Sequence, residues 1–245
     1  MTAARSPRRG LLVAVVSTVA VAALVATAIG TSAAWPIVQE AFFSARYFGE
    51  ALPKVLGAFF VNVQLFVLAE ILILPLGLLI ALARSAPGAA LAPLRLAATA
   101  YVDFFRGVPS ILVIYALGFG IPALQLPGVP KDPFFWALVT LVLIYSAYVS
   151  EVYRAGLESI HPSQERAARA LGLSRIQSLR YVVIPQAFRR VVPPLLNDFI
   201  GLQKDTALVS ILGVVDAFRR AQILKAADFN FTPLMTTAVI FLLIT

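Results

Sequence analysis

Residues 55–82 read VLGAFFVNVQLFVLAEILILPLGLLIAL, an apolar run that is closed by Arg84. A helix needs about 20 mostly apolar residues to cross the hydrocarbon core of a bilayer. The run exceeds this length, although Glu70 and Pro75 interrupt its apolar character. This stretch therefore predicts a membrane-spanning helix.

The composition of the whole chain points the same way. The 245 residues are 60% hydrophobic and only 13% charged, with a mean hydropathy of +0.88. Soluble domains are closer to half apolar and a quarter charged. The other apolar segments are residues 11–34, 92–124 (interrupted at 106–109), 134–153, 191–213 and 232–245. We therefore expect an all-α, polytopic transmembrane helical bundle of about six spans.

The first and last apolar segments each allow two interpretations. Residues 11–34 form either a retained span or a cleaved signal peptide, because Ser32-Ala33-Ala34 resembles a cleavage site. The length of the segment favours the retained span. Residues 232–245 number about 14, too few to cross a bilayer. This predicts a last helix that is either incomplete or truncated, and truncation is favoured.

The basic residues predict the orientation. Most of the 20 Lys and Arg residues lie at the N-terminus, from Arg5 onward, or between spans on the same side, above all in residues 154–190. Basic loops are retained on the cytoplasmic side of a membrane. We expect a cytoplasmic N-terminus, with tail, first span and external connector in residues 1–54. Residues 55–245 would form the transmembrane core, with residues 154–190 as a cytoplasmic loop.

Several function classes are excluded by missing residues. The net charge of +8 could suggest nucleic acid, but the chain has no basic patch interleaved with aromatic residues. It has no cysteine and one histidine, His161, so it predicts neither a disulfide framework nor a metal site. It also lacks the phosphate-binding G-x-x-x-x-G-K-[ST], the zinc-binding H-E-x-x-H and the nucleophile motif G-x-S-x-G. We expect no catalysis and no cofactor bound by this chain itself.

The loop of residues 154–190 carries signals for two short helices. Ser163 is a candidate N-cap for a helix over 164–171, which Gly172 would end. Ser174 would cap a second helix over 175–183, stopped by Pro185. These residues alone leave two interpretations open: a docking hairpin with a small-residue face, or a solvated basic loop.

The loop resembles the EAA loop of ABC importer permeases. It reads SQERAARALG at 163–172, followed by VIPQA at 183–187. Flanking stretches are similar to the polar amino-acid branch of that family: FRGVP at 105–109, AYVSEVYRAG at 147–156, PPLLND at 193–198 and KDTAL at 204–208. The resemblance covers the chain from about Val55 to its end.

This resemblance implies a permease subunit of the prokaryotic inner membrane, surrounded by lipid, that moves a polar amino acid or similar small solute. It also implies the partners: a second permease subunit, cytoplasmic ATP-binding subunits that hold ATP and Mg, and an extracytoplasmic solute-binding protein. The alternative is an ATP-independent channel or carrier, which should show an internal inverted repeat or a pore helix. The sequence shows neither.

The resemblance also implies which residues dock on the ATPase: Gln164, Ala167, Ala168, Ala170, Leu171, Gly172, Ile184 and Pro185. One position departs from the family pattern. Arg166 stands where the family has a glutamate, and Glu165 lies one place earlier. Adjacent helix positions point about 100° apart, so Glu165 does not replace that glutamate.

Polar residues inside the predicted spans are candidates for a solute pathway or gate, because charges in a membrane usually face a cavity or a partner. The candidates are Glu70, Asn197, Lys204, Asp205 and Thr206. The alternative is a set of internal ion pairs and hydrogen bonds, with Glu70 and Glu151 as possible partners for Lys204 or Asp205. Arg106 would either anchor at the interface or pair with Asp103.

Overall fold

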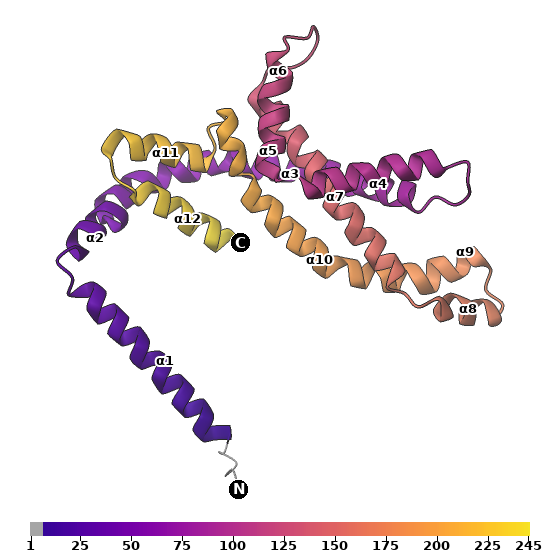
Figure 1. Cartoon of the computed structure of the whole chain (residues 1–245), viewed down its shortest axis with the longest axis horizontal. Coiled ribbons are helices and arrows are strands. Elements are labelled where there is room, and N and C mark those ends of the chain that lie inside the picture. Colours follow the sequence, from indigo (N-terminus) through magenta and orange to yellow (C-terminus); the bar gives the residue numbers. More distant parts are fainter. Residues whose placement is uncertain (1–6) are drawn as a thin grey trace.

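The computed structural model describes residues 7–245, and within that range every regular element is a helix (Figure 1). The all-α class is therefore confirmed, while the tail with Arg5 lies outside the described residues. The elements are α1 (Pro7–Gly30), α2 (Trp35–Phe43), α3 (Ala45–Arg84), α4 (Ala92–Gly107), α5 (Ser110–Tyr115), η1 (Ala116–Gly120), α6 (Ile121–Ala123), α7 (Pro133–Glu158), α8 (Pro162–Ala170), α9 (Arg175–Ser178), η2 (Leu179–Val183), α10 (Ile184–Asp205), η3 (Leu208–Leu212), α11 (Ala217–Asp228) and α12 (Thr232–Ile244). Of these, η1 and η2 are π-helical and η3 is a 3₁₀ helix.

Helix α3 contains the stretch 55–82 and extends well beyond it. It is 40 residues long and begins at Ala45, so the segment expected to be a connector consists of α2 and the first turns of α3. Pro53 and Pro75 both lie inside α3 without ending it. Transmembrane helices tolerate proline because neighbouring groups satisfy the freed backbone carbonyl. The buried residues recur every three or four positions along one face: Ala51, Val55, Phe59, Asn62, Leu65, Ala69, Ile73, Gly77 and Ala81.

Helix α7 lies at the centre of the main core and packs against α3, α4 and α10. Glycine permits the closest approaches. A Cβ at Gly77 of α3 would lie 2.8 Å from Val149 Cγ1, and one at Gly156 of α7 would lie 2.1 Å from Val191 Cγ2 of α10. Small residues at such crossings let transmembrane helices pack closely where water cannot drive association. The two glycines thus set the distances of α3 and α10 from α7.

The segment 92–124 is not a straight span. Helix α4 meets the helical segment Ser110–Ala123, formed by α5, η1 and α6, at an angle of 106° across the break at Val108 and Pro109. Both break residues have extended ψ values, 132° and 131°. Proline disfavours the helical conformation in the residue before it and offers no N–H of its own, which accounts for the break.

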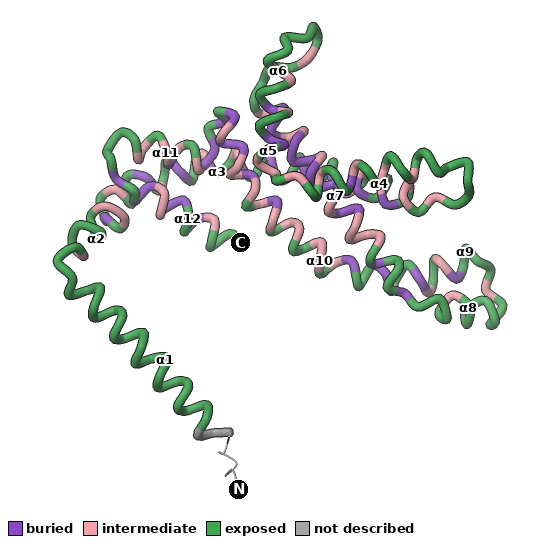
Figure 2. Tube along the Cα trace, viewed as in Figure 1, coloured by how far each residue is buried: buried purple, intermediate pink, exposed green. Residues whose placement is uncertain are grey.

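By length and composition, three helical segments of the described chain could cross a membrane, or four if the bent α4–α5 pair counts as one span. The three are Gly10–Gly30, Trp35–Arg84 and Pro133–Glu158. The expected fifth and sixth spans are also helices, but α10 carries many charges and α12 has only 13 residues. Figure 2 shows α1 exposed from Gly10 to Gly30, as expected for a helix whose apolar side chains contact lipid.

The expected helix stop at Pro185 is wrong. The chain continues from α9 through η2 into α10, and Pro185 occupies the first turn of α10. Proline is tolerated there because the first-turn N–H groups have no intrahelical acceptor. The π-helical segment η2 absorbs the change in hydrogen bonding just before it. The second loop helix is therefore rigidly joined to α10.

The Gly156 crossing predicts a steric penalty. Gly156→Ala should lower the free energy of unfolding by about 1–3 kcal/mol, because the β-branched Val191 cannot swing away from the added methyl group. Thermal unfolding of the detergent-solubilised chain measures the effect. Gly57→Ala is the matched control, since its Cβ would meet nothing within 4 Å and alanine favours the helix by up to about 1 kcal/mol. Equal stability changes for the two variants would contradict this packing.

Candidate functional site

The loop between α7 and α10 forms a helical hairpin, α8 followed by α9, at one end of the molecule (Figure 1). The N-cap of α8 is His161 rather than Ser163: His161 Nδ1 accepts a hydrogen bond from the Ser163 N–H at 3.2 Å. Pro162 then takes the first helical position, which suits its fixed φ angle and missing N–H. Helix α8 ends before Gly172, whose φ of +90° is the left-handed conformation that favours glycine.

The predicted cap at Ser174 is confirmed. The Ser174 N–H donates to Gln177 Oε1 at 2.8 Å, and the Gln177 N–H donates to Ser174 Oγ at 3.3 Å. This reciprocal pair is a capping box, which fixes the start of α9. The turn between α8 and α9 is therefore held at both ends.

The base of the hairpin is tied to the membrane helices. Ile160, Val183 and Ala187 form a small buried cluster between the end of α7 and the start of α10. Arg190 of α10 donates to the Ser159 carbonyl at 2.5 Å, across the two ends of the loop. The hairpin is therefore continuous with α7 and α10 and would move with them.

Most of the predicted docking residues lie on the surface of the hairpin. Leu171 is 86% exposed and Ala168 is only 5% exposed. The other exposed members of the set are Gln164, Ala167, Ala170, Gly172, Ile184 and Pro185. Ala168 instead packs inward. The exposed face combines small side chains with one protruding leucine, and its docking role stays a prediction.

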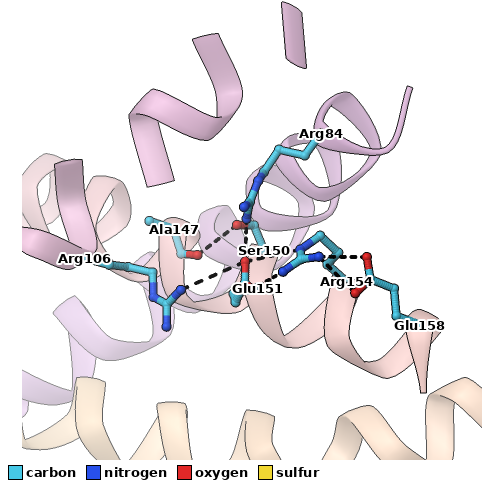
Figure 3. A network of polar contacts seen from close by, with 7 residues as sticks. All are labelled: Arg84, Arg106, Ala147, Ser150, Glu151, Arg154 and Glu158. Atoms are coloured by element: carbon cyan, nitrogen blue, oxygen red, sulfur yellow. Dashed lines mark hydrogen bonds and ion pairs between the residues drawn. The ribbon is translucent and has the colours of Figure 1, made fainter. Parts of the chain in front are cut away.

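A charged cluster lies near the C-terminal end of α7 (Figure 3). Its centre is Glu151, whose carboxylate contacts both Arg84 of α3 and Arg154 of α7. Arg106 of α4 lies 4.0 Å from the same carboxylate, and Arg154 also pairs with Glu158 at 2.7 Å. The side chains of Arg84 and Glu151 are only 13% and 23% exposed. The Glu151 cluster thus joins the ends of α3, α4 and α7.

This cluster changes two expectations. Glu151 pairs with arginines and not with Lys204. Within residues 7–245 Arg106 makes no ion pair with Asp103; it faces Glu151 and lies over the ring of Tyr148 at 5.6 Å. Both groups that Arg106 contacts, Glu151 and Tyr148, belong to α7, whereas proximity in the sequence had suggested Asp103. The interface-anchor role of Arg106 stays a prediction.

The predicted pathway residues of α10 separate into two groups. Asn197 and Lys204 are exposed. Asp205 accepts a hydrogen bond from the Tyr145 hydroxyl at 3.0 Å, and Thr206 is fully buried. Asp205 therefore finds a partner in α7, while Lys204 faces outward.

Thr206 belongs to a buried polar network that sequence reasoning missed. Asn62 Nδ2 donates to Thr206 Oγ1 at 3.1 Å and to Asp216 Oδ2 at 2.9 Å. Asn62 Oδ1 in turn accepts from the Ala217 N–H at 3.0 Å. Asp216 also caps α11 by accepting from the Arg219 N–H at 2.8 Å. A polar Asn62 within the apolar run was the available signal, and a buried amide of this kind requires partners.

Other polar groups are buried without a hydrogen-bond partner among the described residues. They are one carboxylate oxygen each of Glu70 and Asp198, and the side-chain amide nitrogen of Gln203. Near the hairpin, a cavity of about 350 Å³ opens between α4, α7 and α10. Its polar lining includes Arg106, Glu151, Arg190 and Asp198. Within residues 7–245 no cluster of His, Asp or Glu could hold a metal ion.

Long apolar helices with a charged helical hairpin between two of them define a polytopic α-helical membrane protein. The chain belongs to the family described as binding-protein-dependent transport system inner membrane component, whose pattern matches residues 73–245. It is a membrane permease subunit of an ATP-binding-cassette transporter, a transport component. The family match supports this assignment over an ATP-independent channel or carrier.

The similarity extends over most of each relative. An arginine transport system permease protein of Bacillus subtilis is 34% identical over 191 residues, 78% of this chain and 85% of the relative. An L-cystine transport system permease protein of the same organism is 34% identical over 207 residues, 84% of this chain and 82% of the relative. The crystal structure of an amino acid ABC transporter with histidines has a chain that matches with a TM-score of 0.71 and 31% identity, covering 78% of this chain and 87% of that one.

The Glu151 cluster predicts a stability effect. Glu151→Gln should lower the free energy of unfolding by about 1–3 kcal/mol, because Arg84 and Arg154 lose a part-buried charged acceptor. Urea or thermal unfolding in detergent measures the change. Glu158→Gln, at the exposed outer end of the same cluster, should cost less than about 1 kcal/mol. A Glu151 variant as stable as the Glu158 variant would argue against a joining role.

Proposed function

We propose that this chain forms the translocation pathway of an ATP-driven importer for a polar amino acid, with ATP hydrolysed by separate subunits. The observation that carries the proposal is the rigid hairpin: an exposed small-residue face continuous with α7 and α10. The relatives named for arginine and L-cystine support a polar amino acid as the solute. The crystal structure named for an amino acid ABC transporter supports the same class.

The proposal includes three partners. Cytoplasmic ATP-binding subunits would bind the hairpin, and on this chain the contact residues would be Gln164, Ala167, Ala170, Leu171 and Gly172. Ala168 would support this face from inside. ATP and Mg would be bound by the ATP-binding subunits and not by this chain. A second permease subunit would complete the pathway, and an extracytoplasmic protein would deliver the solute. The N-terminus would be cytoplasmic, since basic residues concentrate on the hairpin side. Ile184 and Pro185 lie exposed at the start of α10, where they could border the same contact.

Contacts at the base of the hairpin can transmit its movement to the membrane helices. The small cluster at Ile160 and the Arg190 bond fix the hairpin to α7 and α10. Glu151 then connects α7 to α3 and α4. Packed helices move as rigid bodies because close-packed interfaces have discrete arrangements. Displacement of the hairpin by an ATPase would therefore move four membrane helices together.

We assign Glu70, Asn197, Lys204, Asp205 and Thr206 to the pathway or its gate. Asn197 and Lys204 are exposed on α10, where a second subunit or a solute can meet them. The unpartnered oxygen of Glu70 is a buried acceptor that a charged or polar solute could satisfy. Asp205 and Thr206 are bonded to Tyr145 and Asn62, which suits a gate that fixes the end of α10.

Transport should depend on the partner ATPase. In vesicles containing this chain, its co-purifying ATPase and its binding protein, we expect uptake of a radiolabelled polar amino acid only with ATP and Mg. A panel of arginine, cystine and glutamine tests the solute class. Vesicles without the ATPase are the control. Uptake without the ATPase would contradict the proposal, as would no uptake of any amino acid by the complete assembly.

A bulky side chain on the docking face should uncouple the transporter. Ala167→Trp should reduce ATP-dependent uptake roughly tenfold or more and release the ATPase during purification, because interface centres tolerate little added volume. The variant should still insert in the membrane, since Ala167 is exposed. Ala90→Trp, at an exposed position in the loop before α4, is the matched control. Full transport by Ala167→Trp would remove the docking assignment.

A further inference from the structure

The hairpin carries a surface depression between α8 and α9, which we call the hairpin concavity. It measures about 540 Å³ and is open to solvent. The residues that line it are Arg166, Arg169, Ala170, Gly172, Leu173, Ser174 and Gln177. Two of them, Ala170 and Gly172, also belong to the predicted docking set. The concavity is therefore part of the face assigned to the ATPase.

Two positive charges in the concavity lack an ion-pair partner in the part of the chain that the structure describes. Arg166 and Arg169 are three residues apart on α8, so their side chains project from the same side of the helix. Among residues 7–245, neither guanidinium has a carboxylate within 4.0 Å. The nearby acid, Glu165, instead faces Arg175 at 4.0 Å. The concavity is thus basic, and no carboxylate of residues 7–245 neutralises it.

The walls of the concavity are fixed before any partner binds. Gly172 turns the chain in the left-handed conformation, and the Leu173 N–H donates to the Ala168 carbonyl at 3.2 Å. Ser174 and Gln177 use their side chains in the capping box that starts α9. A preformed site loses less conformational freedom on binding than a flexible loop does. Leu171, 86% exposed, protrudes beside the concavity.

We propose that the hairpin concavity binds one or two carboxylate side chains of the ATPase subunit. This proposal rests on the proposed function and goes further by assigning the charge of the partner surface. Arginine presents a planar fork of N–H donors that matches a carboxylate with two parallel hydrogen bonds. The partner surface should therefore place Asp or Glu next to an apolar recess for Leu171. This arrangement gives a role to Arg166, at the position where the resemblance to the permease family implied a glutamate.

Anionic lipid is the competing occupant, since basic cytoplasmic segments also attract acidic headgroups. The geometry favours the protein. The arginines lie in a concave site that borders the docking residues Ala170, Leu171 and Gly172. An ATPase bound to those docking residues would cover both arginines, whereas lipid attraction alone would not require them to adjoin that face.

The test compares charge reversals in the full-length chain, binding the co-purifying ATPase in detergent. The double variant Arg166→Glu with Arg169→Glu should weaken ATPase binding roughly tenfold or more at low salt. The difference should shrink at about 1 M salt, where the screening length falls to about 3 Å. Arg180→Glu is the control: it makes the same charge reversal at one position instead of two, in η2 and outside the concavity, and should alter binding less than about threefold. An equal loss for Arg180→Glu would overturn the proposal in favour of general charge attraction.

A cross-link identifies the partner residues. The chain has no cysteine, so Arg169→Cys offers a single attachment point for a thiol-linked photoreactive probe. Mass spectrometry of the captured ATPase peptide should find Asp or Glu beside the cross-link. Reversing those acids to lysine should restore binding of the Arg166→Glu, Arg169→Glu chain. A captured segment without acidic residues, or no restoration, would overturn the proposal.

Two further outcomes separate this proposal from the docking assignment. If Ala167→Trp abolishes ATPase binding while the double charge reversal leaves it unchanged, the hairpin docks but the acidic contact is wrong. If neither variant affects ATPase binding, the docking assignment itself fails. If the double charge reversal loses binding to vesicles rich in anionic lipid but still binds the ATPase, the concavity is a lipid site and the proposal is overturned.

Discussion

The fold depends on the close packing of α7 against α3 and α10. In a bilayer the lipid chains are as apolar as the side chains, so helix association requires close contact more than burial from water. Gly77 and Gly156 make that contact possible, and Val149 and Val191 fill the space they leave. Once α7 is fixed in this way, its last turn and the first turn of α10 determine where the hairpin starts.

Polar groups then fix the rotation and register of the helices, which the apolar packing leaves undetermined. Apolar faces can slide or rotate past one another at small cost, but a buried polar group without its partner is expensive. Glu151 fixes α3 and α4 against the end of α7, and Asn62 fixes α3 against the start of α11. These two networks lie in different parts of α3, one at its C-terminal end and one nearer its middle. Together they hold the rotation and register of the longest helix.

The sequence predicted features that depend on neighbouring residues, and it missed those that depend on distant ones. The apolar run 55–82 and the cap at Ser174 are local, so length and spacing sufficed. Asn62 and Asp216 are 154 positions apart, and no local pattern pairs them. Pro185 misled in a different way: it lies in the first turn of α10, directly after the π-helical segment η2, where its missing N–H and its ring are tolerated.

Arg166 has consequences for partner choice as well as for affinity. Under the proposed function, the permease must recognise its own ATPase among others of the same class. Specificity of this kind often comes from repulsion of the wrong partner. An ATPase that presents a basic side chain to this position would be repelled by Arg166 and Arg169, since neither charge is neutralised within the described chain. A single exchange of charge on a preformed helix can therefore separate one transporter's subunits from those of another while leaving the hairpin fold, its caps and its connection to α7 and α10 intact.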